Sequence, residues 1–429
     1  MVRKLTATAT ALLAAVSCAP QTQVPTKVRA LVLSSNGEYE PTEVEIKTLT
    51  DIVALEGKVA RMQGDAVLRL SSSDPEVQAA TTGEALLRAM TKSEGRSVTA
   101  SYITDAQGVL WPADFHTWNL VTTYYNLERA WEYFTTDLAV PQAELTQTTV
   151  HYFPEFVLAD ASDQPQRDNA LFFSPLQAFL VLPFDTLQKA PLAINASILT
   201  HEYSHLLFNR RVYGGSYLPD ALNRWAQDGD FTPGLNVLKA LDEGTADFHA
   251  YVASCKTRFG CNTRLLATSF DATQVEARDL SRPLCLDQLT YNNLIRSSLS
   301  VVPGLEYQVG TLLASALYQS ANTDAERQVL ARTLVAAYSD PTAGRPGFSQ
   351  LVTASLTDQS TFTLTAAARA IVRHIPTGNV DLRQKVCTNF ATRLQIPIAS
   401  LTGGGTNDQY DCLASTTTTT ECPRINYNP

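Results

Sequence analysis

Residues 192–211 read LAINASILTHEYSHLLFNRR, and this stretch decides how the rest of the 429-residue chain is interpreted. Apolar residues flank its two histidines at helical spacing: Ile194, Ile198, Leu206 and Leu207. The spacing predicts a single helix over residues 192–211. Residues four apart lie on one face of a helix, so His201 and His205 can direct both imidazoles at one metal ion. A surface helix with two solvated histidines is the alternative, and it fits the apolar flanks poorly.

The residue after His201 completes a known arrangement. His201-Glu202-Tyr203-Ser204-His205 has the pattern HExxH, in which two histidines bind zinc and the glutamate is a general base. Glu202 can reach a water molecule that the metal activates. A purely structural metal site needs no such base, so the motif favours catalysis.

A second acidic motif lies 38 residues beyond His205, in the segment LKALDEGTADF of residues 238–248. Helical spacing predicts a helix over residues 235–253, which places Glu243 and Asp247 on one face. A catalytic zinc needs a third protein ligand and an open position, and Glu243 can be that ligand. Asp247 can accept the outer N–H of a ligand histidine. An acidic surface stripe is the alternative, but few polar residues surround the pair.

The remaining pattern predicts an α+β fold. Short apolar runs predict strands at residues 148–156 and 170–173 and a buried segment at 178–182, all before the first histidine of the motif. Helical periodicity predicts helices over residues 118–134, 306–320 and 324–338, with a shorter one near 84–91. The length favours two packed subdomains.

The first residues resemble an export signal. Arg3 and Lys4 precede an apolar stretch at residues 5–16 that is too short to span a bilayer. Ala15-Val16-Ser17-Cys18 resembles a bacterial lipoprotein signal, in which the cysteine is acylated and becomes the N-terminus. This predicts an exported protein anchored by lipid at Cys18 in the bacterial cell envelope. An ordinary cleaved signal and a secreted protein is the alternative.

The chain is therefore expected to divide into five segments. A signal peptide (1–17) and a tether (18–45) precede an N-terminal α+β subdomain (46–205) that ends in the HExxH helix. A helical C-terminal subdomain (206–377) and a disulfide-stapled tail (378–429) follow.

Cysteine usage fits an oxidising compartment. Seven cysteines are present, and acylation of Cys18 would leave six, an even number suited to disulfides. Short separations favour the pairs Cys255–Cys261 and Cys412–Cys422, which leaves Cys285 with Cys387, although sequence alone does not determine the connectivity. The absence of a CxxC pair argues against a cysteine zinc site.

The charge balance disfavours a nucleic-acid partner. Loss of Arg3 and Lys4 with the signal would lower the net charge from −9 to −11, and no basic run occurs. We expect a monomer whose partner is a peptide or protein and which meets the membrane only through its lipid anchor.

The motifs together resemble the thermolysin-like zinc metallopeptidases, the gluzincins. In that family a helical HExxH is followed by a helix with a Glu ligand and, four residues later, an Asp, as in residues 242–247. Asn169-Ala170-Leu171-Phe172-Phe173 resembles the family's edge strand, whose backbone and Asn side chain hold the substrate. Arg278, in RDLSRP of residues 278–283, resembles the arginine that contacts the substrate carbonyl. The ordered matches cover residues 116–320.

The resemblance implies a zinc-dependent endopeptidase with two subdomains and the metal between them. Glu202, as general base, and Arg278 would be catalytic, and Asn169 and Ala170 would bind substrate. The family's tyrosine oxyanion donor would fall at Tyr217, with Tyr213 as the alternative.

Two departures from the family are evident. Residues 212–234 form a longer connection than in thermolysin and resemble an inserted loop. No histidine lies between His249 and His374, so the family's oxyanion histidine is missing, with Glu306 or Tyr307 near its place. The alternative function is therefore a weak or inactive zinc-containing surface lipoprotein that binds peptides or glycans.

The other histidines are expected to be structural: His116, His151, His249 and His374.

Acylation at Cys18 gives the first test. The envelope fraction of expressing cells should contain a protein whose N-terminal peptide begins at Cys18 and carries lipid by mass spectrometry. Cys18→Ser should release the protein from the membrane, because it removes the acylated thiol. An unmodified soluble protein that starts at another residue would contradict this expectation.

Overall fold

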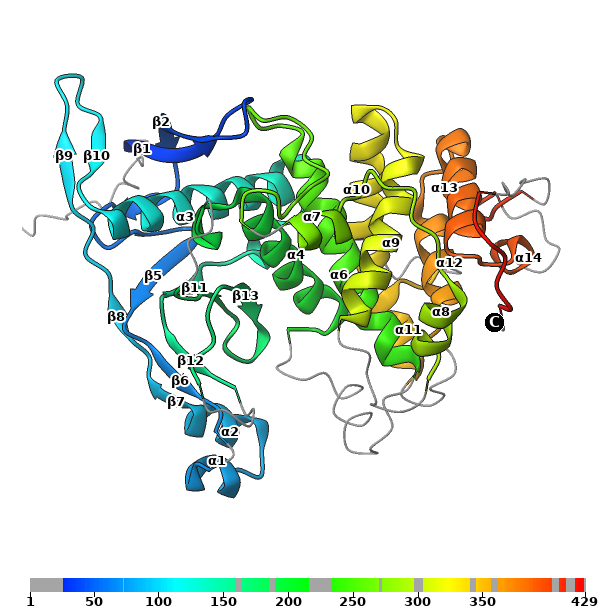
Figure 1. The fold of residues 1–429 in the computed structure, drawn as a ribbon, viewed down its shortest axis with the longest axis horizontal. Coiled ribbons are helices and arrows are strands. Elements are labelled where there is room, and N and C mark those ends of the chain that lie inside the picture. The colour runs from blue at the N-terminus through cyan, green and yellow to red at the C-terminus, as the bar shows by residue number, and fades with distance from the viewer. Residues whose placement is uncertain are drawn as a thin grey trace, which may run out of the picture.

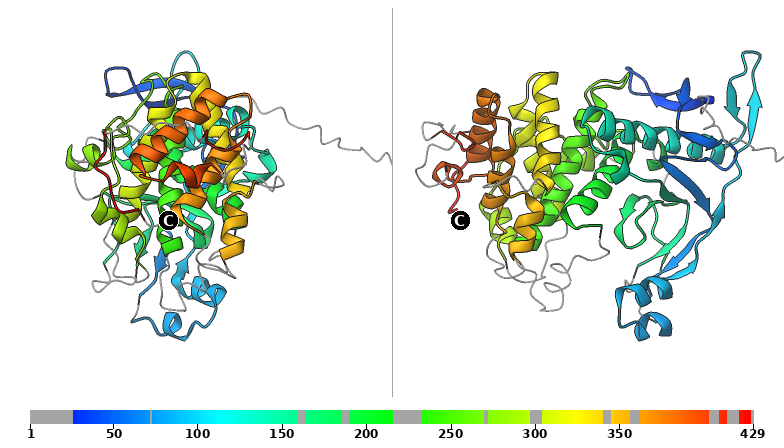
Figure 2. Two further views of the ribbon diagram at one scale, coloured as in Figure 1. Left: turned by 90° about the vertical axis from the view of Figure 1, so that its right-hand side faces the viewer. Right: turned by 180° about the vertical axis from the view of Figure 1, so that it is seen from behind.

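Strands dominate the N-terminal region and helices the C-terminal region, as an α+β fold requires (Figure 1). The computed structural model describes residues 26–71, 73–158, 164–184, 190–215, 233–269, 272–296, 304–339, 345–355, 362–402, 409–413 and 421–427. Seen from behind, the sheets and the C-terminal helices lie at opposite ends of the molecule (Figure 2).

Three sheets build the N-terminal region. A four-stranded sheet has the order β2-β1-β10-β9, with β1 (Thr26–Leu33), β2 (Tyr39–Ile46), β9 (Tyr102–Thr104) and β10 (Leu110–Pro112). The largest sheet has the order β13-β14-β11-β5-β4-β3, and β8 pairs with β5. Its strands are β3 (Leu49–Asp51), β4 (Glu56–Gly57), β5 (Ala60–Gly64), β8 (Arg96–Ser97), β11 (Thr148–Tyr152), β13 (Ala170–Phe173) and β14 (Ala178–Val181). The third sheet joins β6 (Val67–Arg69), β7 (Thr91–Ser93) and β12 (Glu155–Val157), and the helices α1 (Pro75–Ala79) and α2 (Gly83–Met90) lie between β6 and β7.

The tether expected at residues 18–45 is wrong from Thr26 onward. This segment forms the β1–β2 hairpin, in which Val28 and Ala30, two residues apart on one face of β1, are buried. The proline content that favoured a tether is compatible with a strand here, because Pro41 lies in β2 at the edge of its sheet. A proline at an edge costs no hydrogen bond to a further strand.

The predicted strand at residues 148–156 is divided. Phe153 has a left-handed backbone with φ of 52°, and the chain passes there from β11 in the largest sheet to β12 in the third. The strand predicted at 170–173 is confirmed as β13. The segment predicted to be buried at 178–182 is buried, and its residues 178–181 form β14.

The long helix α3 (Phe115–Glu132) ties the N-terminal region together, and it continues as a π-helical turn (Tyr133–Asp137). Its Glu128 is 1% exposed and accepts hydrogen bonds from the backbone N–H groups of Lys47 and Thr48. Thr122 accepts the N–H of Leu31 in β1. A buried carboxylate that accepts backbone donors fixes the relative position of the two elements, because a lost partner would leave a charge unpaired.

Helices form the C-terminal region: α4 (Ala196–Val212), α6 (Pro233–Ser254), α7 (Ala272–Ala277), α8 (Gln288–Leu294), α9 (Leu305–Ser320), α10 (Asp324–Ser339), α11 (Phe348–Ser355), α12 (Leu364–His374), α13 (Val380–Arg393) and α14 (Ile398–Leu401). The helices predicted at 235–253, 306–320 and 324–338 are confirmed as α6, α9 and α10.

The segment 378–429 is only in part a tail, because α13 packs on α9 and buries Val386 and Phe390 completely.

The helices α6 and α9 meet backbone to backbone. A Cβ atom on Gly244 would lie 2.5 Å from the carbonyl oxygen of Gly310, and one on Gly310 would lie 2.9 Å from Cβ of Glu243. No side chain larger than hydrogen fits at such a contact, so the two glycines set how closely these helices approach.

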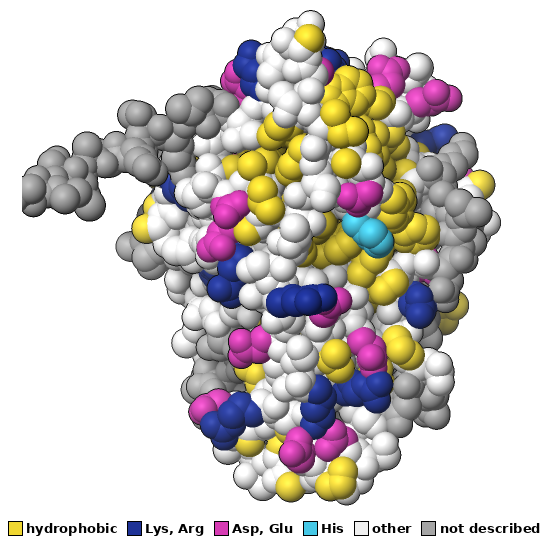
Figure 3. Space-filling model, turned by 90° about the vertical axis from the view of Figure 1, so that its left-hand side faces the viewer, with side chains coloured by type: hydrophobic (Ala, Val, Ile, Leu, Met, Phe, Trp, Pro, Cys, Tyr) yellow, Lys and Arg dark blue, Asp and Glu magenta, His cyan; other side chains and the backbone are white. Residues whose placement is uncertain are grey.

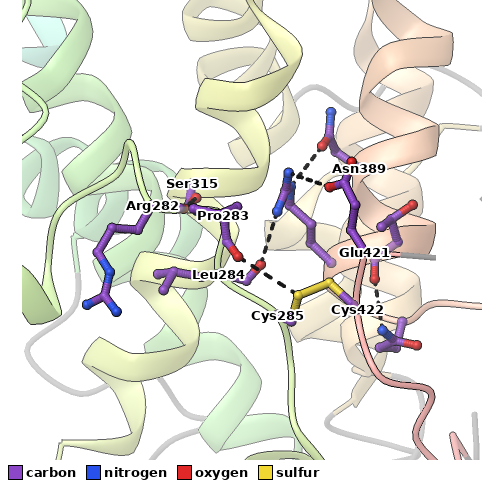
Figure 4. Close-up of a disulfide and its surroundings, with 11 residues drawn as sticks. Arg282, Pro283, Leu284, Cys285, Ser315, Asn389, Glu421 and Cys422 are labelled. Atoms are coloured by element: carbon purple, nitrogen blue, oxygen red, sulfur yellow. Dashed lines mark hydrogen bonds and ion pairs between the residues drawn. A yellow bond between two sulfur atoms is a disulfide. The ribbon is translucent and has the colours of Figure 1, made fainter. Parts of the chain in front are cut away.

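Three disulfides are present, and two differ from the expected pairs. Cys255 pairs with Cys261 as expected, but Cys285 pairs with Cys422 and Cys387 with Cys412. Proximity in sequence was misleading because α13 brings Cys387 beside residues 409–413, which leaves Cys422 near Cys285. Figure 4 shows the Cys285–Cys422 bridge between the segment 282–285 and the C-terminal residues.

Arg393 of α13 reinforces this junction. Its guanidinium donates hydrogen bonds to Asn389 Oδ1 at 3.0 Å and to the carboxylate of Glu421 at 3.2 Å. On the other side, Ser315 of α9 donates to the carbonyl oxygen of Arg282 at 2.7 Å (Figure 4). The segment that follows Arg278 is thus held by α9, α13 and a disulfide together.

Charges of both signs are interspersed on the face at the strand-rich end, where hydrophobic side chains gather near a histidine (Figure 3). Within the described part of the chain, no helix is both long enough and apolar enough to cross a bilayer.

The disulfide pattern predicts unequal effects on stability. Joint replacement of Cys285 and Cys422 by serine should destabilise the protein more than joint replacement of Cys255 and Cys261, whose bridge closes a short loop. Chain entropy gives about 5 kcal/mol for the long loop and about 2 kcal/mol for the short one. Denaturant unfolding of both double variants measures the difference. Equal unfolding midpoints, or a peptide map that joins Cys412 to Cys422, would contradict the structure.

Candidate metal centre

Asn195 sets the start of the helix that carries the HExxH motif. Its side-chain oxygen accepts the N–H groups of Ser197 at 3.0 Å and Ile198 at 3.2 Å, which caps α4. The helix therefore begins at Ala196, and residues 192–194 form a 3₁₀ turn before it, so the helix predicted from residue 192 is four residues shorter at its start. The amide of Asn195 also donates to the Leu265 carbonyl, which anchors this cap in the core.

Three side chains from α4 and α6 converge as a group that could hold a metal ion: His201, His205 and Glu243. The Nε2 atoms of the two histidines lie 2.9 Å apart, and Glu243 carboxylate oxygens lie 3.2 Å from Nε2 of His201 and 3.7 Å from that of His205. Ligands at about 2.1 Å from a tetrahedral zinc lie about 3.4 Å from each other. The observed separations bracket that value, so the group fits a zinc ion.

A buried carboxylate oxygen points to the same conclusion. Among the described residues, Glu243 Oε2 accepts no hydrogen bond, although it is buried and Nε2 of His201 lies 3.2 Å from it. A buried carboxylate oxygen left in this state is costly unless a cation binds it. The donor set of two imidazoles and one carboxylate suits zinc, but the geometry does not by itself identify the metal.

Each histidine is oriented by its own carboxylate. His201 Nδ1 lies 2.9 Å from Asp247 Oδ1, as the sequence motif predicts. His205 Nδ1 lies 2.6 Å from Asp242 Oδ1, a role that sequence reasoning missed although Asp242 stands directly before Glu243. Because Nδ1 faces a carboxylate in both rings, Nε2 of each ring is directed at the metal position.

Glu202 is held in place by the edge strand β13. Its carboxylate oxygen Oε2 accepts the backbone N–H of Phe172 at 2.7 Å, and its side chain is buried. Since β13 pairs only with β14 in the described sheet, its other edge faces the site. Asn169 and Ala170 belong to the same edge, and the Asn169 side chain accepts the N–H of Ala170 at 2.9 Å.

One cavity of about 190 Å³ is lined by the three residues of the metal group, by Glu202 and Asp247, by the edge of β13, and by Arg278 and Tyr307. Arg278 lies beneath the ring of Tyr307, with its guanidinium carbon 4.9 Å from the ring centroid. Its Nη2 atom lies 2.5 Å from Asp247 and 3.8 Å from Glu243. Arg278 therefore holds the carboxylate that orients His201, in addition to facing the cavity.

The electrostatics of these side chains favour a cation. Burial lowers the pKa of His205, but the charges of Asp242 and Glu243 outweigh it and raise that pKa to about 10. Burial raises the pKa of Glu202, while Arg278 and both imidazoles help to hold the pKa of Glu243 low against burial. The site therefore attracts either protons or a metal ion, and acid should displace the metal.

The other histidines lie apart from the metal group. His249 is fully buried, contacts the Tyr133 hydroxyl through Nδ1 at 3.0 Å, and has its pKa lowered to about 3 by burial. His374 contacts the carbonyl of Ala370 within its own helix. The packing role expected for His249 agrees with this placement.

The expected tyrosine donor is not among the residues that can be placed. Tyr217, with most of the loop expected at 212–234, lies outside the described residues. The alternative, Tyr213, packs against Phe208 and is not part of the described cavity lining. Of the two residues near the position of the missing histidine, Tyr307 lines the cavity, and Glu306 is not among its described lining.

Comparison of the chain with protein-family models and with curated protein sequences finds no match. Function is therefore inferred from the geometry and chemistry of the site.

The contact between His205 and Asp242 predicts an effect on metal affinity. Asp242→Ala should weaken zinc binding about 10- to 100-fold, because it removes the acceptor that fixes the ring. Asp242→Asn should weaken it less, since an amide oxygen still accepts the Nδ1–H group but carries no charge. Competition with a chromophoric chelator measures both. If Asp242→Ala bound zinc as tightly as the wild type, the orienting role would be refuted.

Proposed function

We propose that this protein is a zinc-dependent endopeptidase with a thermolysin-like arrangement of two subdomains around the metal. The observation that carries this proposal is the position of Glu202. It lies in one cavity with His201, His205 and Glu243, and its carboxylate is fixed by the backbone of an edge strand. A site built only to hold a metal would need its three ligands. It would not need a further carboxylate, anchored separately, beside them.

Zinc, when bound by His201, His205 and Glu243, would supply a Lewis acid that polarises a carbonyl group and lowers the pKa of water. The remaining steps fall to this chain's own residues. Glu202 takes a proton from the attacking water and passes it to the nitrogen of the leaving amine.

The edge of β13 would hold an extended peptide. An extended segment adds to a free strand edge through backbone hydrogen bonds, and Asn169 and Ala170 of this edge line the cavity of the metal group. The same cavity has an apolar wall formed by Leu192, Ile198 and Leu266, which are all buried. This wall favours substrates with an aliphatic or aromatic side chain next to the cleaved bond.

The disulfides bear on the cellular compartment in which the protein would act. Three disulfides among the described residues suit an oxidising environment. We propose an exported monomer that is anchored to the bacterial envelope through Cys18.

The variant Glu202→Gln tests the mechanism. It should lower peptide hydrolysis at least 10²-fold, while the zinc content stays near one per chain, because glutamine cannot accept the proton. The amide oxygen can still accept the N–H of Phe172, so the local structure should be kept. Cleavage of an internally quenched peptide library, together with metal analysis, gives both readouts.

The matched control is His205→Ala, which should lose zinc and activity together. Full activity of Glu202→Gln would remove the general base from the mechanism. A wild type that holds zinc but cleaves no peptide would favour the alternative of a zinc-containing binding protein.

A further inference from the structure

Tyr307 stands out among the residues that line the metal cavity. Its side chain is 42% exposed, and its hydroxyl has no hydrogen-bond partner among the described residues. Three other polar residues of the lining each have a partner within the protein: Arg278 lies against Asp247, Asn169 accepts the N–H of Ala170, and Glu202 accepts that of Phe172. A polar hydroxyl without a partner, beside a metal-binding group, is available to a ligand.

The position of Tyr307 is imposed by the contact between α6 and α9. Tyr307 precedes Gly310 by one helical turn, and Glu243 precedes Gly244 by one residue. Since the two glycines touch backbone to backbone, the first turn of α9 lies beside the metal ligand of α6. Arg278 occupies one face of the ring, which limits the ring's freedom to turn away.

We infer that the Tyr307 hydroxyl is a catalytic hydrogen-bond donor to the carbonyl oxygen of the cleaved peptide bond. This inference rests on the proposed function. When water attacks the carbonyl carbon, a C–O bond forms and the carbonyl π electrons move to oxygen, while Glu202 receives the water proton. Tyr307 keeps its own proton and donates only a hydrogen bond. The proton on Glu202 then moves to the nitrogen, the oxygen's electron pair re-forms the carbonyl bond, and the C–N bond breaks with its electron pair leaving on the amine.

A tyrosine is chemically suited to this task. A phenol is a donor at neutral pH, because its ordinary pKa is about 10. A donor aimed at the oxygen that gains charge stabilises the transition state more than the ground state, so it acts on kcat. Tyr307 would thus supply one of the contacts that the missing histidine makes in thermolysin-like enzymes.

The competing role is packing, in which the ring only supports Arg278. Tyr307→Phe separates the two roles, because phenylalanine keeps a ring over the guanidinium and removes only the hydroxyl. Glu306→Gln is the matched control, since Glu306 is the neighbour in sequence and is not among the described cavity lining.

The experiment uses the mature protein loaded with zinc. For an internally quenched peptide, Tyr307→Phe should lower kcat about 10²-fold with KM changed less than about threefold, and zinc content should be unchanged. The second readout needs no turnover. A peptidyl phosphinate, whose tetrahedral group carries charged oxygens, should bind the variant about 10- to 100-fold more weakly by calorimetry. Glu306→Gln should match the wild type in both.

The two measurements distinguish failure of the inference from failure of the proposed function. Equal kcat and equal phosphinate affinity in Tyr307→Phe would overturn the inference while leaving the proposed peptidase intact. A rise in KM that accounts for the whole loss would also overturn it, in favour of packing. A wild type that cleaves nothing but binds the phosphinate more tightly than Tyr307→Phe would support the donor and refute the peptidase. A wild type that neither cleaves peptides nor binds the phosphinate would overturn both.

Discussion

The burial of charge where α4 meets α6 is the constraint on which the site depends. Four carboxyl groups and one guanidinium share this interface with two imidazoles: Glu202, Asp242, Glu243, Asp247, Arg278, His201 and His205. Each ionised group costs several kcal/mol to remove from water unless partners compensate it. The carboxylates exceed the one guanidinium, so neutral imidazoles leave an excess of negative charge. A bound divalent cation would offset that excess.

The local periodicity of apolar residues was sufficient to predict most of the long helices. The confirmed helices α6, α9 and α10 have apolar faces whose spacing is visible in the sequence, and β13 was located because a short apolar run is bounded by polar residues. The wrong predictions concern segments whose structure is determined by contacts with distant parts of the chain. Residues 26–45 form strands because β1 pairs with β2 and β10, and no local signal distinguishes an edge strand with proline from a linker. The disulfide pairs depend on the path of α13, which is also a tertiary property.

For the site, spacing along a helix was informative because it restricts which side chains share a face. The i, i+4 pairs His201–His205 and Glu243–Asp247 converge as that spacing predicts. Asp242 was missed because the sequence analysis assigned to the site only the helix face that carries Glu243 and Asp247, and the packing of α6 on α4 brings the preceding residue to His205 as well. The contact of Glu202 with the backbone of β13 carries no sequence signature at all. The glycine contact between α6 and α9 is likewise visible only once the helices are packed.

The bridge between Cys285 and Cys422 determines how proteolytic cleavage of the backbone would be detected. It links residues 137 positions apart, and within that span Cys387 is joined to Cys412. A single backbone cut anywhere between Cys285 and Cys422 leaves two pieces that remain covalently joined. A molecule nicked in this region would therefore migrate as one band on a non-reducing gel and separate into fragments only after reduction. For a protein proposed to cut peptide bonds, a single band on a non-reducing gel is thus no evidence that the chain has escaped its own activity.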